Sequence, residues 1–398
     1  MRRVGIHFWL LECYALILAL VQMAGGVHTD EAKYLLSIPY PHPPLLRDLF
    51  ASTALLPGHE FFWRFVIASL ATQSVWLLLD LGYVLSPLRR KVLVCSWLLS
   101  SAVILQAGTV MIAVLTGVFG LLCVTLALRP KPIARSSAPL IGCLWFFALF
   151  SSYQSVLFAP LLLGVLRSGH VSWRKVLLFL GLPLLLLAIY TLTNPMALAS
   201  MLKVGSQDAV LPLTARFSQV LWICTLAGSG LLTIVGLFGI LTSGRMDFLA
   251  TLLLLVLYIF ISSQTYYALL LTPILVAGLM SLLLRRKISG QLFLPMHLIL
   301  TAVLVFKAFP DMHPTSARST MRFLHDHAIT GLVLIDGPFG HEWQYESAGP
   351  IGRFTQTLSS SVEDTAQALV CTKKTCEEDF GDEWVRMEGA PTEVWVRK

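Results

Sequence analysis

The chain has 398 residues, of which 56% are hydrophobic and 13% are charged, whereas roughly a quarter of a typical soluble domain is charged. A mean hydropathy of +0.75 over this length excludes an ordinary soluble enzyme, because one core cannot bury so much apolar surface. The net charge of +7 is unevenly spread: residues 1–309 hold 21 basic and 8 acidic side chains, and residues 310–398 hold 8 and 14. No basic stripe interleaved with aromatic residues indicates nucleic-acid binding.

This charge division predicts a membrane domain, residues 1–309, followed by a small acidic soluble domain, residues 310–398. Apolar runs of about 17–25 residues predict eleven membrane spans, with ten or twelve as alternatives, near residues 6–24, 61–86, 92–107, 110–128, 136–152, 155–167, 176–193, 218–241, 247–264, 267–284 and 291–309. The expected fold is therefore an all-α polytopic membrane protein with a C-terminal α+β domain. In that domain we expect a helix over 319–327 and strands within 331–336, 368–370, 383–388 and 392–397.

Orientation follows from the Lys and Arg content of the short connections, which is higher on the cytoplasmic side. With the N-terminus inside, the inner segments carry fifteen Lys and Arg, and the outer loops carry four, namely Lys33, Arg47, Lys203 and Arg216. An odd number of spans then places the C-terminal domain outside. We expect an integral protein of a bacterial inner membrane or its equivalent, with a cytoplasmic N-terminus and a periplasmic or extracytoplasmic C-terminal domain. The first apolar run is interpreted as an uncleaved span because Met23-Ala24-Gly25-Gly26 is a weak cleavage site.

Two outer loops, 25–60 and 194–217, are long, and long loops between helices usually have a function. In the first, Asp30 and Glu31 follow the outer end of the first span, with Thr29 expected to cap a short helix. A carboxylate there can take a proton from an attacking hydroxyl, or help to hold a divalent cation over a phosphate. The alternative is that both acids complement the helix dipole and face water.

The same loop continues with Pro41-His42-Pro43-Pro44, which prevents a helix and predicts a rigid extended turn. An amphipathic interfacial helix is expected to follow over residues 45–50. His42 is a proton donor, a phosphate contact or simply a turn residue, and its position does not choose among these.

Two of the seven cysteines, Cys371 and Cys376, lie in the C-terminal domain, five positions apart. A local disulfide is the natural interpretation in an oxidising compartment. Free thiols and a metal site remain as alternatives, although a zinc site would need two more ligands.

The Asp30-Glu31 pair beyond the first span, Tyr34 three residues on, and His42-Pro43-Pro44-Leu45 together resemble the GT-C glycosyltransferases. The similar branch contains the protein O-mannosyltransferases and the lipid A aminoarabinose transferases. These enzymes have about 11–13 spans, a large first outer loop and often a soluble C-terminal domain. The architecture expected for this chain resembles theirs over its whole length. Tyr266-Tyr267 with Pro273 also resembles the family's Tyr-Tyr helix opening.

The resemblance implies a polyprenyl-phosphate-sugar donor in the outer leaflet. The sugar would be transferred with inversion, on the extracytoplasmic face, to a hydroxyl of a glycan, glycolipid or protein acceptor. Asp30 would be the general base or part of a cation site, and Glu31 would support it. The implied cations for the leaving phosphate are Lys33, Arg47, Arg64, Lys203 and Arg216. The other implied substrate contacts are Tyr34, His42, Tyr266 and Tyr267.

The sequence departs from the family's pattern at two places. The turn over residues 105–110 lacks the second acid of many members, which argues against metal dependence, although a divalent cation such as Mg²⁺ or Mn²⁺ is retained as an option. Ser152-Tyr153-Gln154-Ser155 stands where many members carry a Lys. A transporter or flippase of lipid-linked saccharides, or a non-catalytic membrane scaffold, therefore remains as an alternative.

Overall fold

A computed structural model describes most of the chain, namely residues 2–38, 43–81, 84–199, 212–262, 264–285, 287–312, 316–336, 341–347, 351–355, 365–372 and 383–398. The chain forms two compact units. The first unit comprises Met1–Leu20 and Pro39–Phe309, and the second comprises Val21–Ile38 and Pro310–Lys398. The second unit thus includes a segment that the sequence analysis assigned to the membrane domain.

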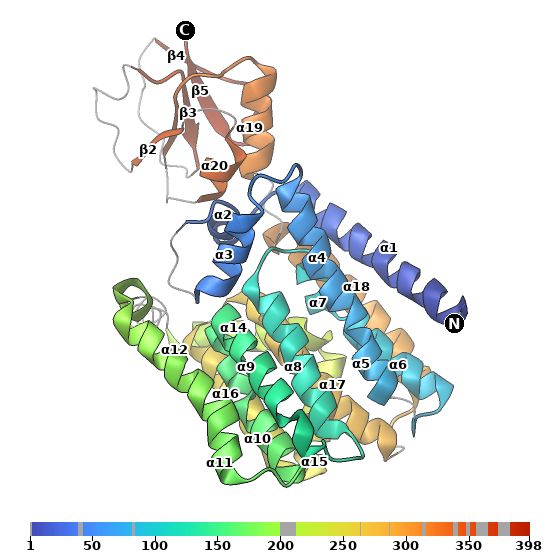
Figure 1. Cartoon of the computed structure of the whole chain (residues 1–398). Helices are drawn as coiled ribbons and strands as arrows, with labels where there is room; N and C mark the ends of the chain where they lie inside the picture. Colours follow the sequence, from blue (N-terminus) through green and yellow to red (C-terminus); the bar gives the residue numbers. More distant parts are fainter. Residues whose placement is uncertain are drawn as a thin grey trace. The chain divides into compact units, whose positions relative to one another are not determined.

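The first unit is a bundle of helices (Figure 1). Its elements are α1 (Arg2–Gly25, which continues into the second unit), α3 (Pro44–Ser52), α4 (His59–Gln73), α5 (Val75–Leu81), α6 (Pro87–Leu98), α7 (Ser101–Gln106), α8 (Ile112–Leu128), α9 (Ala138–Ser151), α10 (Ala159–Ser168), α11 (Trp173–Val176), α12 (Leu182–Thr193), α14 (Leu213–Gly228), α15 (Leu231–Ser243), α16 (Met246–Ile261), α17 (Ala268–Leu284) and α18 (Gly290–Met312). The prediction of a mostly helical fold is confirmed, and each apolar run contains helix.

Within the described residues, five helical segments are long and apolar enough to cross a membrane: Ile6–Gly25, His59–Leu81, Trp173–Thr193, Thr265–Leu284 and Gly290–Pro310. A bent pair, α14 with α15, makes a sixth if it counts as one span. Three shorter apolar helices are Ile112–Leu128, Arg135–Ser151 and Met246–Ile261. These segments are compatible with a membrane protein.

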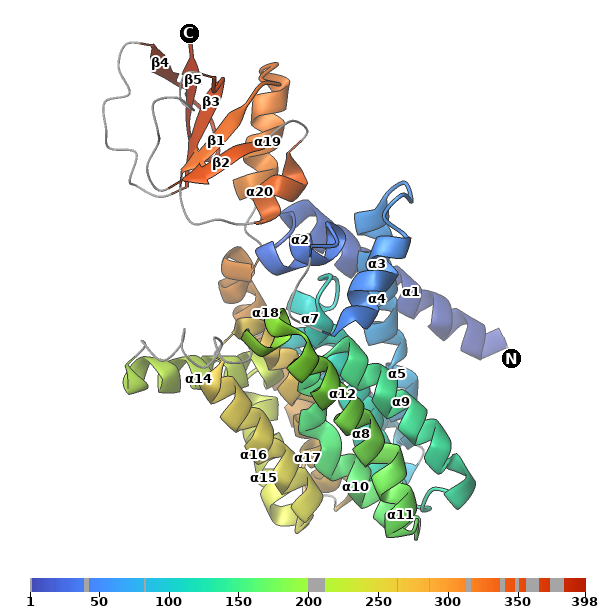
Figure 2. The same ribbon diagram turned by 60° about the vertical axis from the view of Figure 1, so that its left-hand side comes forward.

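The segment predicted as a span over 218–241 is not one straight helix, because the chain turns by 93° between α14 and α15. Figure 2 shows α14 lying across the bundle and α15 running along it. Ser229 and Gly230, with φ angles of 55° and 69°, form the break. Hydropathy alone does not reveal such a break, because the residues on both sides are equally apolar.

Hydroxyl groups satisfy the backbone carbonyls that this break exposes. Ser101, Thr272 and Thr233 each donate a hydrogen bond to a carbonyl in the last turns of α14, at Leu226, Ala227 and Cys224 respectively. A backbone carbonyl without a hydrogen-bond partner in an apolar environment destabilises the fold by several kcal/mol, on the order of magnitude known for buried polar groups. The bend therefore depends on α7 and α17 as well as on its own residues.

Helix α17 is almost entirely buried, which places it at the centre of the first unit. It crosses α15 through glycines: a Cβ atom at Gly239 would lie 2.0 Å from the carbonyl oxygen of Gly278. Small residues allow such close approach of helix backbones in membrane proteins. The crossing therefore requires glycine at both positions.

Glu12, in the middle of α1, is held by α4. Its carboxylate accepts hydrogen bonds from Ser69 Oγ and Gln73 Nε2, both at 2.7 Å. Because an acid in an apolar environment is costly unless it is satisfied, these bonds give Glu12 a structural role in joining α1 to α4.

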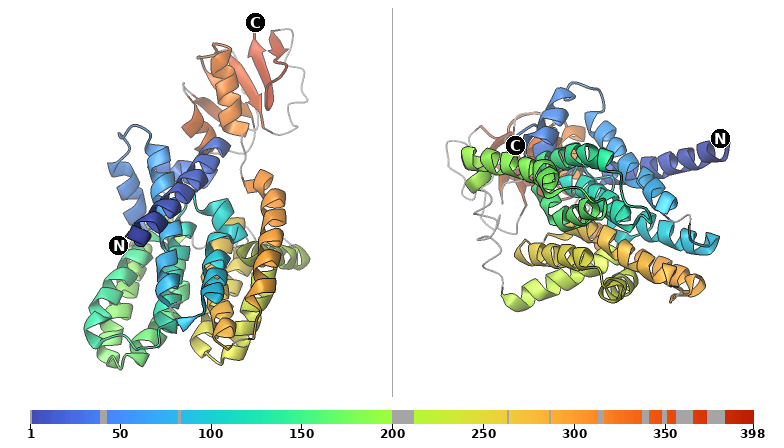
Figure 3. Two further views of the ribbon diagram at one scale, coloured as in Figure 1. Left: turned by 90° about the vertical axis from the view of Figure 1, so that its right-hand side faces the viewer. Right: turned by 60° about the horizontal axis from the view of Figure 1, so that its bottom comes forward.

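The second unit contains a five-stranded sheet in the order β2-β1-β3-β5-β4 (Figures 2 and 3). Strand β1 (Val333–Asp336) is parallel to β2 (Ile351–Thr355) and β3 (Ala368–Cys371), and β5 (Glu393–Arg397) is antiparallel to β3 and β4 (Trp384–Arg386). Helices α19 (Ser316–Asp326) and α20 (His341–Glu346) complete it. The predicted α+β character is confirmed, while β2 and α20 were not predicted.

The core of this unit lies between the sheet and these two helices. Trp343 of α20, Met321 and Leu324 of α19, and Ile335 and Val370 of the sheet form one buried cluster. Helix α2 (Thr29–Leu35) packs against α20, which explains why Val21–Ile38 belongs to this unit.

Candidate functional site

Helix α2 presents Asp30 and Glu31 in its first turn. The N-cap residue is His28, one position before the predicted cap at Thr29. Glu31 is completely buried, and its Oε2 accepts the backbone N–H of His28 at 2.9 Å. This is one half of a capping box, in which the third helical residue bonds back to the cap. Glu31 therefore fixes the beginning of α2.

Asp30 differs from its neighbour because its side chain is 26% exposed. Its Oδ1 accepts a hydrogen bond from Lys33 Nζ at 2.8 Å, and the Lys33 side chain is 19% exposed. The two charges lie one turn apart on the same face of α2. Asp30 is thus a partly accessible carboxylate whose direction is set by a neighbouring ammonium group.

Helix α2 also carries three buried apolar residues. Ala32, Tyr34 and Leu35 are each at most 4% exposed, and α2 packs against α20. Tyr34, a predicted substrate contact, is therefore a buried side chain.

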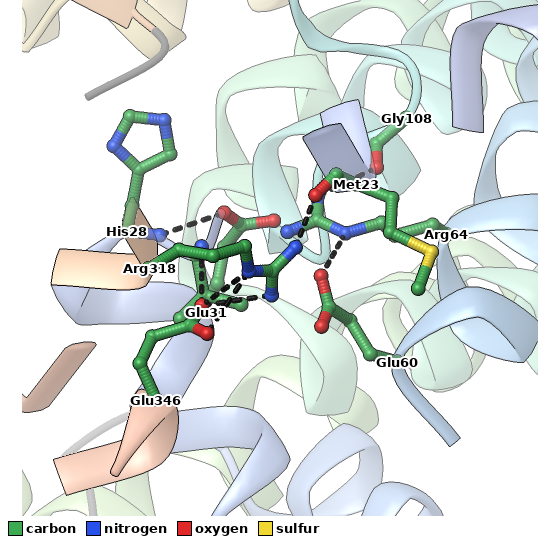
Figure 4. Close-up of polar contacts among 9 residues, drawn as sticks. Met23, His28, Glu31, Glu60, Arg64, Gly108, Arg318 and Glu346 are labelled. Atoms are coloured by element: carbon green, nitrogen blue, oxygen red, sulfur yellow. Dashed lines mark hydrogen bonds and ion pairs between the residues drawn. The ribbon is translucent and has the colours of Figure 1, made fainter. Parts of the chain in front are cut away.

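An ion pair between Arg318 of α19 and Glu346 of α20 holds the link between α1 and α2 (Figure 4). Arg318 Nη2 lies 2.7 Å from Glu346 Oε1, and Arg318 Nε lies 2.9 Å from Glu346 Oε2. Arg318 Nη1 also donates to the carbonyl of Met23, and Glu346 Oε1 accepts the backbone N–H of Val27 at 3.3 Å. Both side chains are at most 10% exposed.

A second contact from α20 reaches the first residue of α2, where Thr29 Oγ1 donates to Glu342 Oε2. Sequence reasoning missed Arg318, Glu342 and Glu346. One signal was present, since Glu342 and Glu346 are four residues apart and hence on one face of a helix. The contact between segments so distant in the chain had no signal in the sequence.

In the first unit, Arg64 is completely buried, although the sequence analysis placed it among the phosphate contacts. Its Nε lies 2.8 Å from Glu60 Oε1, and its Nη1 donates to the carbonyl of Gly108 at 3.1 Å (Figure 4). Gly108 belongs to the turn that lacks the expected second acid. Through Arg64, the carboxylate of Glu60 is connected to this turn. The sequence analysis did not single out Glu60, although its i,i+4 spacing from Arg64 indicates an ion pair on one helix face.

A chain of polar side chains also joins the ends of several helices in the first unit. Gln154 Nε2 donates to Tyr258 Oη at 3.0 Å, and Tyr258 Oη donates to Tyr267 Oη at 2.9 Å. Tyr266 packs edge-on against Tyr267, with ring centroids 4.6 Å apart. The structure thus brings the predicted residues Tyr266 and Tyr267 together, next to the Gln154 segment where the resemblance expects a Lys.

Gln106, the last residue of α7, is hydrogen-bonded to the segment that contains Tyr266 and Tyr267. Its Nε2 donates to the carbonyl of Thr265 at 3.1 Å, which places the turn after α7 beside the segment that opens α17. Gln106 Oε1 is buried and accepts no hydrogen bond from the described residues. This oxygen is consequently a polar group with an unused acceptor position.

Two of the remaining predicted cations, Arg47 and Arg216, lie on different helices. Arg47 lies on α3 with its side chain 28% exposed and 3.3 Å from Asp48, and Arg216 lies on α14 with its guanidinium 6.0 Å from the ring centre of Phe260. Lys203 and His42 lie outside the described residues.

Cys371 is disulfide-bonded, and its proposed partner Cys376 lies outside the described residues. Among the residues whose positions are described, no group of three or more His, Cys, Asp and Glu side chains has the geometry to hold a metal ion. No protein-family model, curated protein or solved structure matches this chain.

Proposed function

We propose that the chain is a membrane glycosyltransferase of the GT-C type with eleven spans and a cytoplasmic N-terminus. It transfers a sugar from a polyprenyl-phosphate-linked donor to a hydroxyl of a glycan, glycolipid or protein. The second unit then lies on the extracytoplasmic side, where α2 follows the outer end of α1. The inner excess of Lys and Arg supports this orientation.

The observation that carries this proposal is the division of roles between two adjacent acids. Glu31 is buried and caps α2, whereas Asp30 remains partly exposed beside Lys33. A solvated surface pair would leave both acids in water. A general base instead needs one accessible carboxylate held at a fixed direction, which is the arrangement of Asp30.

In the proposed reaction, the acceptor oxygen attacks the anomeric carbon and a new C–O bond forms there with inversion. The bond between that carbon and the phosphate oxygen breaks, and its electron pair leaves with the polyprenyl phosphate. The proton of the acceptor hydroxyl passes to Asp30, which later returns it to water. Every atom and charge is thereby accounted for without a further reactant.

Arg47 and Arg216 are the described cations best suited to the leaving phosphate. Both side chains are partly exposed, whereas Arg64 is completely buried and engaged by Glu60 and Gly108. Arginine binds phosphate oxygens through strong charge-assisted hydrogen bonds. Arg64 is consequently assigned to the scaffold.

The test is the Asp30→Asn variant in cells that otherwise lack the protein. Mass spectrometry of surface glycolipids and glycoproteins would identify the sugar and acceptor, and would show loss of transfer at unchanged protein abundance. Asp326→Asn is the matched control, because the Asp326 side chain is 76% exposed on α19. Transfer at the wild-type level in Asp30→Asn would disprove the role of Asp30.

Movement of a lipid-linked saccharide across the membrane is the second candidate function. The 93° bend between α14 and α15 favours it, since transporters use broken helices to form sites in the membrane. Purified protein in vesicles containing a fluorescent polyprenyl-phosphate sugar separates the two: translocation without sugar transfer supports a flippase.

A further inference from the structure

We propose that Arg318 and Glu346 of the second unit are positioning residues for Asp30 of the same unit. This inference rests on the proposed function, since it assigns to these residues the task of holding its general base. Neither residue touches the acceptor or donor in this proposal. Each acts through the link between α1 and α2.

The link between α1 and α2 is held along its length. It runs over Gly26, Val27 and His28, between the end of α1 and the beginning of α2. Arg318 binds the carbonyl of Met23 before the link, and Glu346 binds the N–H of Val27 within it. Thr29, at the end of the link, donates to Glu342. These three attachments restrict rotation of α2 about its own axis.

These attachments are connected to one another through Arg318. The Arg318 guanidinium binds the Glu346 carboxylate through Nε and Nη2, and its remaining nitrogen Nη1 binds Met23. A planar guanidinium can make these contacts together because its donors form a rigid fork. A lysine has a single ammonium group and would hold only part of this arrangement.

The link also lies close to the Arg318 side chain. Gly26 has a φ angle of +84°, and a Cβ atom there would lie 3.3 Å from Arg318 Cβ. The backbone of the link therefore passes directly over the Arg318 side chain. A substitution of Arg318 would therefore change the surroundings of the link backbone at Gly26. Gly26 lies three residues before the first turn of α2, which contains Asp30.

A positioning role affects the activity of each folded molecule and not only the amount of folded protein, because an enzyme loses activity when a catalytic group is displaced by about 1 Å. If Arg318 only stabilised the C-terminal unit, its replacement would lower abundance but leave transfer per molecule unchanged. If it positions Asp30, transfer per molecule falls while the rest of the unit stays folded. The two roles therefore differ in a measurable quantity.

The experiment uses the full chain in lipid nanodiscs and compares wild type with Arg318→Gln, Arg318→Lys and Glu346→Gln. Hydrogen exchange followed by mass spectrometry measures residues 21–38 and, separately, the sheet of the same unit. In parallel, glycan transfer in cells is divided by protein abundance. Arg386→Gln is the matched control, since that side chain lies on β4 of the same unit, is 64% exposed and is 4.0 Å from Glu393.

For Arg318→Gln we expect about tenfold faster exchange in residues 21–38, little change in the sheet, and about tenfold lower transfer per molecule. Arg318→Lys should recover part of both. Glu346→Gln, which keeps an oxygen for Val27, should be milder than Arg318→Gln and covers the case in which the latter fails to accumulate. Arg386→Gln should match the wild type.

The outcomes separate this inference from the proposed function. Unchanged exchange in residues 21–38 of both Arg318→Gln and Glu346→Gln overturns the positioning role, whatever the activity. Faster exchange with unchanged transfer per molecule also overturns it. If Asp30→Asn keeps full transfer, the proposed function fails instead, and the exchange data still show whether the link is held by Arg318.

Discussion

The Glu60–Arg64 pair of the first unit and the Arg318–Glu346 pair of the second are both buried, but they connect different things. Glu60 and Arg64 lie one turn apart on α4, so that a single helix brings them together. Arg318 and Glu346 lie on two helices and also bind the link before α2. The two charges of the first pair meet within one helix, with one further bond from Arg64 to the Gly108 carbonyl, whereas the second pair joins segments from opposite ends of the chain.

This difference predicts which substitutions lower the global stability of the protein and which release only one segment. A local pair forms with its helix, and its loss leaves a buried charge inside a bundle that many other contacts maintain. The distant pair exists only after α19, α20 and the link have met. We therefore expect variants of the first pair to affect global stability and variants of the second to release one segment.

The largest effect is expected for Arg64→Met. It would leave Glu60 buried without its cation and the Gly108 carbonyl without its donor, at a cost of about 3–5 kcal/mol. Thermal unfolding of the purified protein in detergent measures this loss. Arg129→Met is the control, because the Arg129–Asp80 pair is largely exposed and such pairs contribute less than about 1 kcal/mol. Equal effects of the two variants would contradict the assigned importance of burial.

Glu346→Ala should come next, with release of the link as its main consequence. The variant removes the acceptor of both Arg318 and Val27, which costs about 3 kcal/mol locally. Limited digestion with trypsin, followed by mass spectrometry, should show new cleavage after Lys33. Glu383→Ala tests specificity, since the Glu383 side chain is 70% exposed beside Arg397. Protection of Lys33 in Glu346→Ala would refute the comparison.

Replacements of Glu31 should have a smaller, graded effect. Glu31→Gln keeps an oxygen that can accept the His28 N–H, whereas Glu31→Ala removes the cap at a cost of about 0.5–2 kcal/mol. Transfer per molecule should therefore follow the order wild type, Glu31→Gln, Glu31→Ala. Equal activity of the two variants would show that capping is not the role of Glu31.

The smallest effect is expected for Lys33→Gln. Its i,i+3 pair with Asp30 is partly exposed, and such helix pairs contribute about 0.2–0.5 kcal/mol. The unfolding midpoint should stay within experimental error, with weak dependence on salt. A large drop would mean that Lys33 has a structural role that these contacts do not explain.

The helical segments were predictable because each apolar run is long and is bounded by polar or charged residues. The bend at Ser229 and Gly230 was not, since three hydroxyl groups from elsewhere in the bundle and in α15 satisfy its carbonyls. Strand β2 and helix α20 were missed because neither is marked by a long periodic pattern.

At the site, sequence alone led to Asp30 and Glu31 as the acids of interest. It did not separate their roles, because only the fold shows that Glu31 is buried and caps α2. The place of Arg64 also required the structure, since a cation near a predicted membrane boundary is equally consistent with a lipid headgroup or an internal ion pair.

The contact between Arg318 and Met23 also bears on the order in which the chain is made and completed. These residues are 295 positions apart, so the ribosome has released nearly the whole chain before they can meet. The segment around Asp30 is among the first to be synthesised and must wait for α19 and α20 to acquire its final form. A chain that stops before α19 would lack the bonds from Arg318 and Glu346 to the segment that precedes Asp30.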